Sequence, residues 1–252
     1  MKTIIFGDMH GRLVWYDIIK KEQPDKTIFL GDYVSTHDAD ISEEQQCCNL
    51  EDILNYKTDN PNDVVLLRGN HDMQHLGYHW AQCSGLFLKV RDWLSESNMK
   101  QRFLDNTQWV YVEDNFVFSH AGISKEWWNY LNLGDATKDN LLKINELEPS
   151  ALFGFTPNRY SDYTGDSYTQ PCTWIRPFSL LQCHIDNWNQ VVGHTRVATP
   201  GNILVEFGKY SNKSQAQCKE ELGITMNEFW CIDALPFQYM VIEDGKREMR
   251  KF

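Results

Sequence analysis

The chain has 252 residues, enough for one large α/β domain or two small ones, and 42% of them are hydrophobic, which is ample for a buried core. Its 35 acidic residues outnumber 24 basic ones and give a formal net charge of −11. A nucleic acid polymer is therefore not expected as the main partner, because proteins that bind one present a basic surface. A small phosphate ester held by a metal is compatible with this charge.

The seven cysteines are scattered along the chain, and none are spaced as CxxC. An odd, unpatterned set is typical of reduced thiols rather than of a disulfide framework. The N-terminus shows no signal peptide, since only four residues separate Lys2 from Gly7, and no apolar run approaches the length of a membrane span. We therefore expect a cytoplasmic protein with no membrane partner.

The N-terminal part of the chain alternates predicted strands with predicted helices. A strand, a helix and a second strand at its start indicate a parallel βαβ unit. Ser42 can cap the second helix, and the acidic residues that follow suit its first turn. In chain order, the periodicity predicts elements at 2–6, 13–22, 26–30, 42–56, 64–67 and 86–94, with a continuation of the last helix through Phe103 left open.

The C-terminal part begins with a predicted hairpin, 109–112 and 116–119, which turns over Glu113–Asn115. An aromatic-rich insertion follows over 124–187. It reads either as a cap whose aromatic rings pack on the domain or as a wall that stacks a nucleobase or a peptide aromatic. The rest of the chain holds predicted strands at 203–207, 229–233 and 239–243 and a polar surface loop or short helix at 211–221.

Five predicted strands end in glycine or serine followed by side chains of metal-ligand type. Polar side chains rarely gather at the ends of buried strands for packing reasons, because burying them unpaired is costly. Imidazole nitrogen and carboxylate oxygen suit borderline and hard divalent ions. The five segments are Gly7-Asp8-Met9-His10-Gly11, Gly31-Asp32, Gly69-Asn70-His71-Asp72, Ser119-His120-Ala121-Gly122 and Gly193-His194-Thr195.

The ordered set GDxHG, GDYV, RGNHD, SHAG and GHT resembles the calcineurin-like metallophosphoesterases over Gly7 to Thr195. RGNH and GDYV lean toward the phosphoprotein phosphatase branch and its relatives, including the diadenosine-tetraphosphatase group. The resemblance implies an α/β fold, an αββα sandwich of two mixed sheets with flanking helices. Because the five segments must converge, we expect a single domain over 1–252 with the cap-like insertion at 124–187.

The resemblance also implies two divalent metal ions, Mn²⁺ first in vitro with Fe or Zn as alternatives. One ion would be bound by Asp8, His10 and Asp32, and the second by Asp32, Asn70, His120 and His194. In an extended segment, Asp8 and His10 would point to the same side. A hydroxide bridging two such ions would attack the phosphorus atom at neutral pH. Taken singly, each of these residues could instead be a turn, a cap or a core histidine.

The family reading makes His71 the proton donor to the leaving oxygen, with Asp72 holding its ring. A carboxylate partner raises the pKa of an imidazole, which suits an acid near neutral pH. The alternative is that His71 only makes local hydrogen bonds. Four histidines carry no motif and are read as surface or core residues: His37, His75, His79 and His184.

The arginines depart from the family pattern, because Ser35-Thr36 stands where phosphoprotein phosphatases continue GDYV with Asp-Arg. Another cation is then needed for a dianionic phosphate. Arg196 is the first candidate, since it would share a face with His194 in an extended segment. Arg68 can be structural or flank the substrate, and Arg176 and Arg12 are weaker candidates because a surface salt bridge also explains an arginine.

We therefore predict a phosphatase that acts on a phosphate monoester, in the manner of a Ser/Thr phosphoprotein phosphatase. The substrate would be a phosphorylated small molecule, a nucleotide or a phosphoprotein. Hydrolysis of a dinucleoside polyphosphate or a phosphodiester is the alternative within the enzyme class. A metal-free scaffold on the same fold is the alternative outside it, disfavoured because the metal ligands and His71 are all present.

Overall fold

The computed structural model describes residues 1–36, 38–96, 98–156, 166–205, 214–234 and 237–252. The chain divides into two compact units, unit 1 (Met1–Gln108 with Pro236–Phe252) and unit 2 (Trp109–Leu235). Each unit contains a five-stranded sheet with parallel and antiparallel neighbours. The predicted α/β class with two mixed sheets and flanking helices is confirmed, whereas the single domain stays a prediction.

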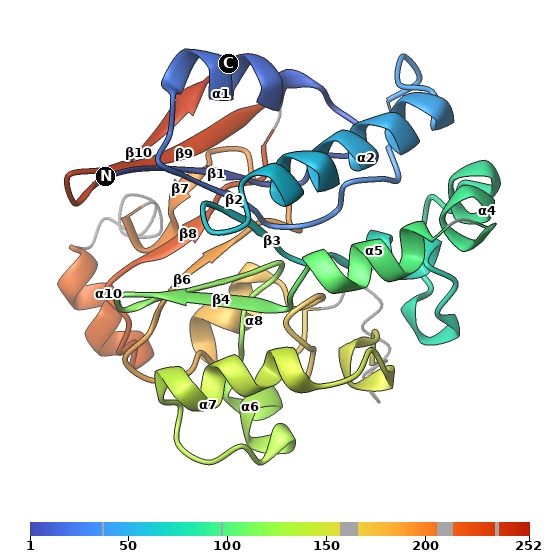
Figure 1. Cartoon of the computed structure of the whole chain (residues 1–252). Helices are drawn as coiled ribbons and strands as arrows, with labels where there is room; N and C mark the ends of the chain where they lie inside the picture. Colours follow the sequence, from blue (N-terminus) through green and yellow to red (C-terminus); the bar gives the residue numbers. More distant parts are fainter. Residues whose placement is uncertain (37, 97, 157–165, 206–213, 235–236) are drawn as a thin grey trace. The chain divides into compact units, whose positions relative to one another are not determined.

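The sheet of unit 1 has the order β10-β9-β1-β2-β3 (Figure 1). β1, β2 and β3 run parallel, and α1 connects the first two, which confirms the predicted βαβ unit. β9 and β10 continue the sheet antiparallel on the other side of β1. The bounds are β1 Lys2–Phe6, α1 Val14–Glu22, β2 Lys26–Phe29, β3 Val64–Leu66, β9 Gln238–Glu243 and β10 Lys246–Lys251.

The parallel strands of unit 1 are buried on both faces. Ile4, Ile5 and Phe6 are fully buried, and the ring of Phe6 lies 4.8 Å from that of Phe29 between centroids. Near-continuous apolar runs of this kind are what central parallel strands require.

Besides α1, the helical segments in the described part of unit 1 are α2 Glu43–Asp59, α3 Asn70–His75, η1 His79–Ala81, α4 Leu88–Glu96 and α5 Met99–Asn106. Ser42 caps α2 as predicted, because its Oγ accepts the N–H of Gln45 at 3.0 Å. The open continuation beyond residue 94 is a separate helix, α5. The short helix α3, which begins at Asn70, was not predicted.

The sheet of unit 2 has the order β4-β5-β6-β8-β7 (Figure 1). β4 and β5 form the predicted hairpin, with Asp114 in the left-handed region at φ 52°. The strand predicted over 203–207 is wrong, since pairing stops at Asn202, residues 203–205 are helical, and 206 and 207 lie outside the described ranges. The bounds are β4 Val110–Glu113, β5 Phe116–Ser119, β6 Asn189–Val192, β7 Gly201–Asn202 and β8 Phe229–Cys231.

The described part of the insertion is helix and loop, as predicted. Trp127 and Trp128 are buried, and Trp127 Nε1 donates to the carbonyl of Leu152 at 3.1 Å, so these rings pack within unit 2. Tyr160 and Tyr163 of the proposed aromatic wall fall outside the described ranges. Besides residues 203–205, the helical segments in the described part of unit 2 are α6 Lys125–Leu131, α7 Lys138–Leu142, η2 Lys143–Glu146, η3 Ala151–Phe153, α8 Pro177–Gln182 and α10 Gln215–Leu222.

Across the described residues, none of the helices combines the length and the apolar character needed to cross a membrane.

Candidate active site

Three loops of unit 1 gather the first candidate ligands at one edge of its sheet. Asp8 follows β1, Asp32 follows β2 and Asn70 opens α3 just after β3. Because these strands are parallel, their carboxyl ends meet at the same edge. Ligand atoms of Asp8, His10 and Asp32 lie within 4.8 Å of one another. Asp8, Asp32 and Asn70 are each at most 3% exposed.

Two of these ligands have a strained backbone. His10 and Asp32 are in the left-handed region, at φ 46° and 51°, a conformation that costs a residue with a β-carbon about 1–2 kcal/mol. The N–H of His10 donates to the carbonyl of Asp32 at 2.8 Å, which ties the two loops together. The extended Asp8–His10 segment assumed from the sequence is wrong, and this turn is what brings the two side chains together. Such strain is typical of functional sites.

The imidazole of His10 is arranged to bind a cation through Nε2. Its Nδ1 lies 2.9 Å from the carbonyl of Val34, and a carbonyl only accepts, so Nδ1 carries the proton. Nε2 is left with its lone pair, 3.7 Å from Asp8 Oδ2. Burial lowers the pKa of His10 to about 4, against the opposing attraction of Asp32. The ring is therefore neutral at physiological pH, the form that metals bind.

The Asp32 carboxylate needs the two glycines beside it. A β-carbon on Gly69 would lie 2.1 Å from Asp32 Oδ1, and one on Gly31, whose φ is 108°, would lie 2.6 Å from the nitrogen of Gly69. The same Oδ1 accepts the N–H of His71 at 3.0 Å. The glycines that end β2 and β3 in the motifs thus allow this close approach.

The carboxylate of Asp72, the residue expected to hold the ring of His71, accepts three backbone N–H groups. Its Oδ2 accepts the N–H groups of Asp32 at 2.8 Å and Gly69 at 2.9 Å, and its Oδ1 accepts that of Tyr33 at 2.8 Å. The carboxylate therefore fastens the loop after β2 to the start of α3. It positions the backbone that carries Asp32 and His71.

The ring of His71 lies beside the ligand cluster of unit 1, with its centroid 5.6 Å from that of His10 and the rings at 88°. Its Nδ1 contacts Ser35 Oγ at 2.7 Å and Cys83 Sγ at 3.5 Å. Neither contact was predicted from the sequence. The signal that could have found Ser35 is its place directly after GDYV, in the slot where the family carries a polar side chain.

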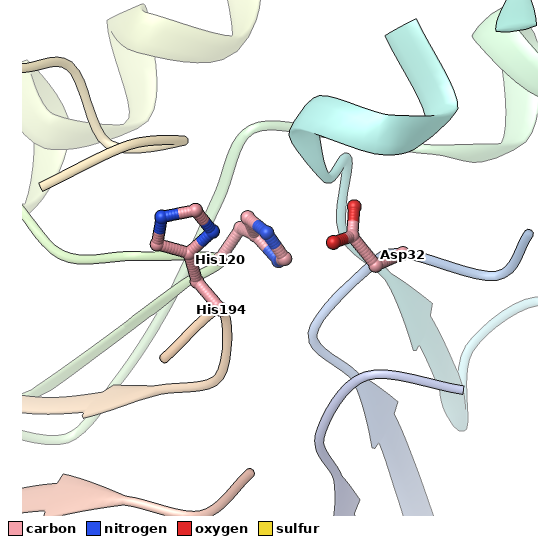
Figure 2. Close-up of side chains that lie close together, drawn as sticks. All are labelled: Asp32, His120 and His194. Carbon is pink, nitrogen blue, oxygen red and sulfur yellow. The ribbon is translucent and has the colours of Figure 1, made fainter. Parts of the chain in front are cut away.

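Two histidines of unit 2 form a second candidate ligand group (Figure 2). His120 follows β5 and His194 follows β6, which are parallel neighbours, and their ring centroids lie 5.0 Å apart. Nε2 of His194 lies 3.1 Å from the carbonyl of Trp174 and so carries the proton, which leaves Nδ1 for a metal. His194 is also left-handed, at φ 58°.

The two arginine candidates near His194 differ in their contacts with the turn that carries it. The segment assumed to be extended at His194 turns sharply instead, with the N–H of Thr195 2.6 Å from the carbonyl of Gly193, so the geometry that favoured Arg196 is wrong. Arg196 is exposed. Arg176 lies against the same turn, where its Nη1 donates to Thr195 Oγ1 at 3.1 Å and lies 3.5 Å from the carbonyl of His194.

Arg68 and Arg12 are engaged within unit 1. Arg68 is 7% exposed and donates to Thr107 Oγ1 at 3.0 Å and to the carbonyls of Leu104 and Thr107 at 2.9 and 2.8 Å, which supports the structural alternative for it. Arg12 donates to the carbonyl of Met9 at 3.3 Å.

The histidines without a motif fit their prediction. His75 and His184 are buried, and burial lowers the pKa of both. His79 is exposed, and His37 falls outside the described ranges.

The chain is similar to known proteins both in its sequence profile and in its fold. A profile of calcineurin-like phosphoesterases matches residues 1–198. A cold-active protein-tyrosine phosphatase from a Shewanella species is similar over 98% of this chain and 80% of its own, with 18% identity and a TM-score of 0.56. A protein serine/threonine phosphatase from Saccharomyces cerevisiae is similar over 100% of this chain and 79% of its own, with 13% identity and a TM-score of 0.57.

At these identities the two structures show a shared fold. A search among curated proteins gave no match. The family profile covers most of the chain and includes all five ligand segments. The chain therefore belongs to the calcineurin-like phosphoesterase family and is a phosphoester hydrolase.

Proposed function

We propose that this protein is a phosphatase that hydrolyses phosphate monoesters with two bound divalent metal ions. The observation that carries the proposal is the buried group of Asp8, His10 and Asp32, whose ligand atoms lie within 4.8 Å of one another and whose histidine has a fixed tautomer. The proposed ligands are, for the first ion, Asp8, His10 and Asp32 and, for the second, Asp32, Asn70, His120 and His194.

The side chains fit such ions chemically. All donors are nitrogen or oxygen atoms, which suits Mn²⁺ in vitro and also Fe or Zn. The positioned tautomers of His10 and His194 leave one lone pair on each ring for a cation. When bound, two divalent ions supply a water of lowered pKa and neutralise charge on the phosphoryl oxygens.

The chain's own contribution to bond cleavage falls to His71. Its ring stands beside His10, so a proton on Nε2 can pass to the oxygen that leaves phosphorus. Asp72 acts through the backbone, because it fixes the loops of Asp32 and His71 with three hydrogen bonds. We therefore propose His71 as the general acid and Asp72 as its positioning partner.

The charge on the substrate requires a further cation, and we propose Arg176 for this role. A monoester dianion favours a guanidinium because of its matched bidentate geometry. The contact of Arg176 with the turn that carries His194 supports its assignment over Arg196. Arg68 is left out, since its hydrogen bonds are used inside unit 1.

The natural substrate is proposed to be a phosphorylated small molecule, a nucleotide or a phosphoprotein. The acidic net charge of −11 does not favour a nucleic acid polymer. The six cysteines that the structure describes are all free thiols, which supports the proposal that the protein works in the reducing cytoplasm.

A substrate panel tests the reaction class. An aryl monoester, a bis-aryl diester and a dinucleoside polyphosphate are compared at equal Mn²⁺ concentration. We expect the monoester to have the highest kcat/KM, and we expect Arg176→Ala to raise KM for the monoester more than for the diester, which carries one charge fewer. Arg196→Ala is the matched control. A diester or polyphosphate turned over faster than the monoester would replace the proposed class with the alternative one.

A further inference from the structure

The loop after β2 holds Ser35 in an unusual conformation. Its φ is 73°, in the left-handed region that residues with a β-carbon rarely adopt, and it is fully buried. Its N–H donates to Gln46 Oε1 at 2.7 Å, a side chain of α2 that is itself fully buried. The side chain of Gln46 therefore holds the backbone of Ser35, and with it the direction of the Ser35 hydroxyl.

The hydroxyl of Ser35 makes two short contacts, and together they settle its single hydrogen. Oγ lies 2.7 Å from the carbonyl of Gly85, which can only accept, so the hydroxyl donates there. Oγ also lies 2.7 Å from Nδ1 of His71. With its hydrogen already given to Gly85, Ser35 must accept in this second bond, and Nδ1 must carry a proton.

The carbonyl of Gly85 lies in a segment fixed by the helix that bears His71. The N–H of Cys83 donates to Gln74 Oε1 at 2.6 Å, and the N–H of Phe87 donates to His75 Nε2 at 3.0 Å. Both acceptors belong to α3. His71, the hydroxyl of Ser35 and the carbonyl of Gly85 thus belong to one hydrogen-bonded group within unit 1.

We propose that Ser35 is a positioning residue that holds His71 with its proton on Nδ1, so that Nε2 is the atom that exchanges a proton with the substrate. The inference rests on the proposed function, in which His71 is the acid. The acid form of His71 is the imidazolium, which carries a proton on both ring nitrogens. As a water oxygen bonds to phosphorus and the P–O bond to the leaving group breaks, the electron pair of the broken bond stays on the leaving oxygen, the Nε2 proton moves to that oxygen, and the ring becomes neutral. The Nδ1 proton stays in its bond to Ser35 throughout.

Ser35→Ala tests the inference, because alanine keeps the β-carbon and removes only the hydroxyl. We expect kcat for an alkyl monoester to fall by about 10–100-fold with little change in KM, the size of effect that a misplaced catalytic group produces. An aryl monoester with a good leaving group needs less protonation and should lose far less. Thr36→Val removes the neighbouring buried hydroxyl and is the matched control, expected to leave both substrates unaffected.

Nitrogen-15 NMR of the histidine side chains gives a readout that does not depend on activity. In the metal-free wild-type protein, neutral His71 should have its proton on Nδ1, and Ser35→Ala should give a mixture of tautomers. A wild-type His71 protonated on Nε2 would overturn the inference even if the variant failed to fold. If Ser35→Ala loses the same rate on both substrates and His71 keeps its tautomer, the inference is also overturned. Ser35 would then serve only to hold the segment of Gly85.

His71→Asn, measured in parallel, separates this inference from the proposed function. If the loss of rate depends on the leaving group in His71→Asn but not in Ser35→Ala, the proposed role of Ser35 is wrong and that of His71 stands. If the loss of rate in His71→Asn does not depend on the leaving group, the assignment of His71 as the general acid is wrong.

Discussion

Asp32→Asn is expected to lose bound metal and to lower kcat/KM for an aryl monoester by about 10³-fold or more. Metal ions supply several kcal/mol of transition-state stabilisation, and each 1.36 kcal/mol is worth about tenfold in rate. Asp32 is proposed to bind both ions, so the loss of its charge is expected to affect the proposed site most. Metal content by mass spectrometry and steady-state rates check the result on the same samples.

The substitution leaves the fold of the site largely in place. In the wild-type protein, the N–H of His71 donates to Asp32 Oδ1 at 3.0 Å, and asparagine keeps an oxygen that can accept this bond. Asparagine also tolerates the left-handed backbone at φ 51°. Asp92→Asn, at an exposed carboxylate paired with Arg91, is the matched control and should change neither quantity. An Asp32→Asn protein with two bound metals and the wild-type rate would refute the ligand assignment.

His71→Asn is expected to keep its metal and to lower the rate by about 10²–10⁴-fold, the usual range for a lost general acid. Its side chain is assigned to proton transfer, whereas its N–H supports Asp32 through the backbone and is retained in the variant. The loss should shrink for substrates with good leaving groups. A series of monoesters of graded leaving-group pKa, with metal content measured alongside, checks both points.

His79→Asn, at an exposed histidine just beyond α3, is the control for this series. It should match the wild-type protein throughout. If His71→Asn instead strips the metal, His71 is a ligand and its assignment as the acid is wrong.

The sequence predicted most of the strands because their apolar runs are decided locally. β1 and β2 are almost wholly buried, so periodicity and composition point the same way. β10 was missed because it is rich in charged residues, four of them basic, as suits a strand at the edge of a sheet. α3 was missed because its six residues are too few to show a helical period.

The places of the proposed metal ligands in the fold were predictable because each lies in the segment that follows a strand along the chain. Contacts between distant segments were not. Ser35 reaches Gly85, 50 residues away, and His71, 36 residues away, and no local pattern records such pairs. The family resemblance implied that Asp72 holds the ring of His71, and no local pattern records its hydrogen bonds to the N–H groups of Asp32 and Tyr33, about 40 residues away.

The backbone conformation near Arg196 was likewise not predictable from the local sequence. The argument for it needed an extended chain after His194, and the sequence did not reveal the left-handed turn at φ 58° that the structure contains. Histidine is one of the residues that tolerates this region, so no glycine marks the turn. Arg176 contacts that turn, but from the sequence it is a weaker candidate because a surface salt bridge also explains an arginine, and no local pattern records its contact with His194, 18 residues away.

The most direct test of the account is the metal content of the wild-type protein, measured together with its rate of monoester hydrolysis. The protein is stripped with a chelator and then titrated with Mn²⁺. The account predicts no turnover after stripping, two ions bound per chain on titration, and a rate that rises with their occupancy. Full turnover by the stripped protein would contradict it.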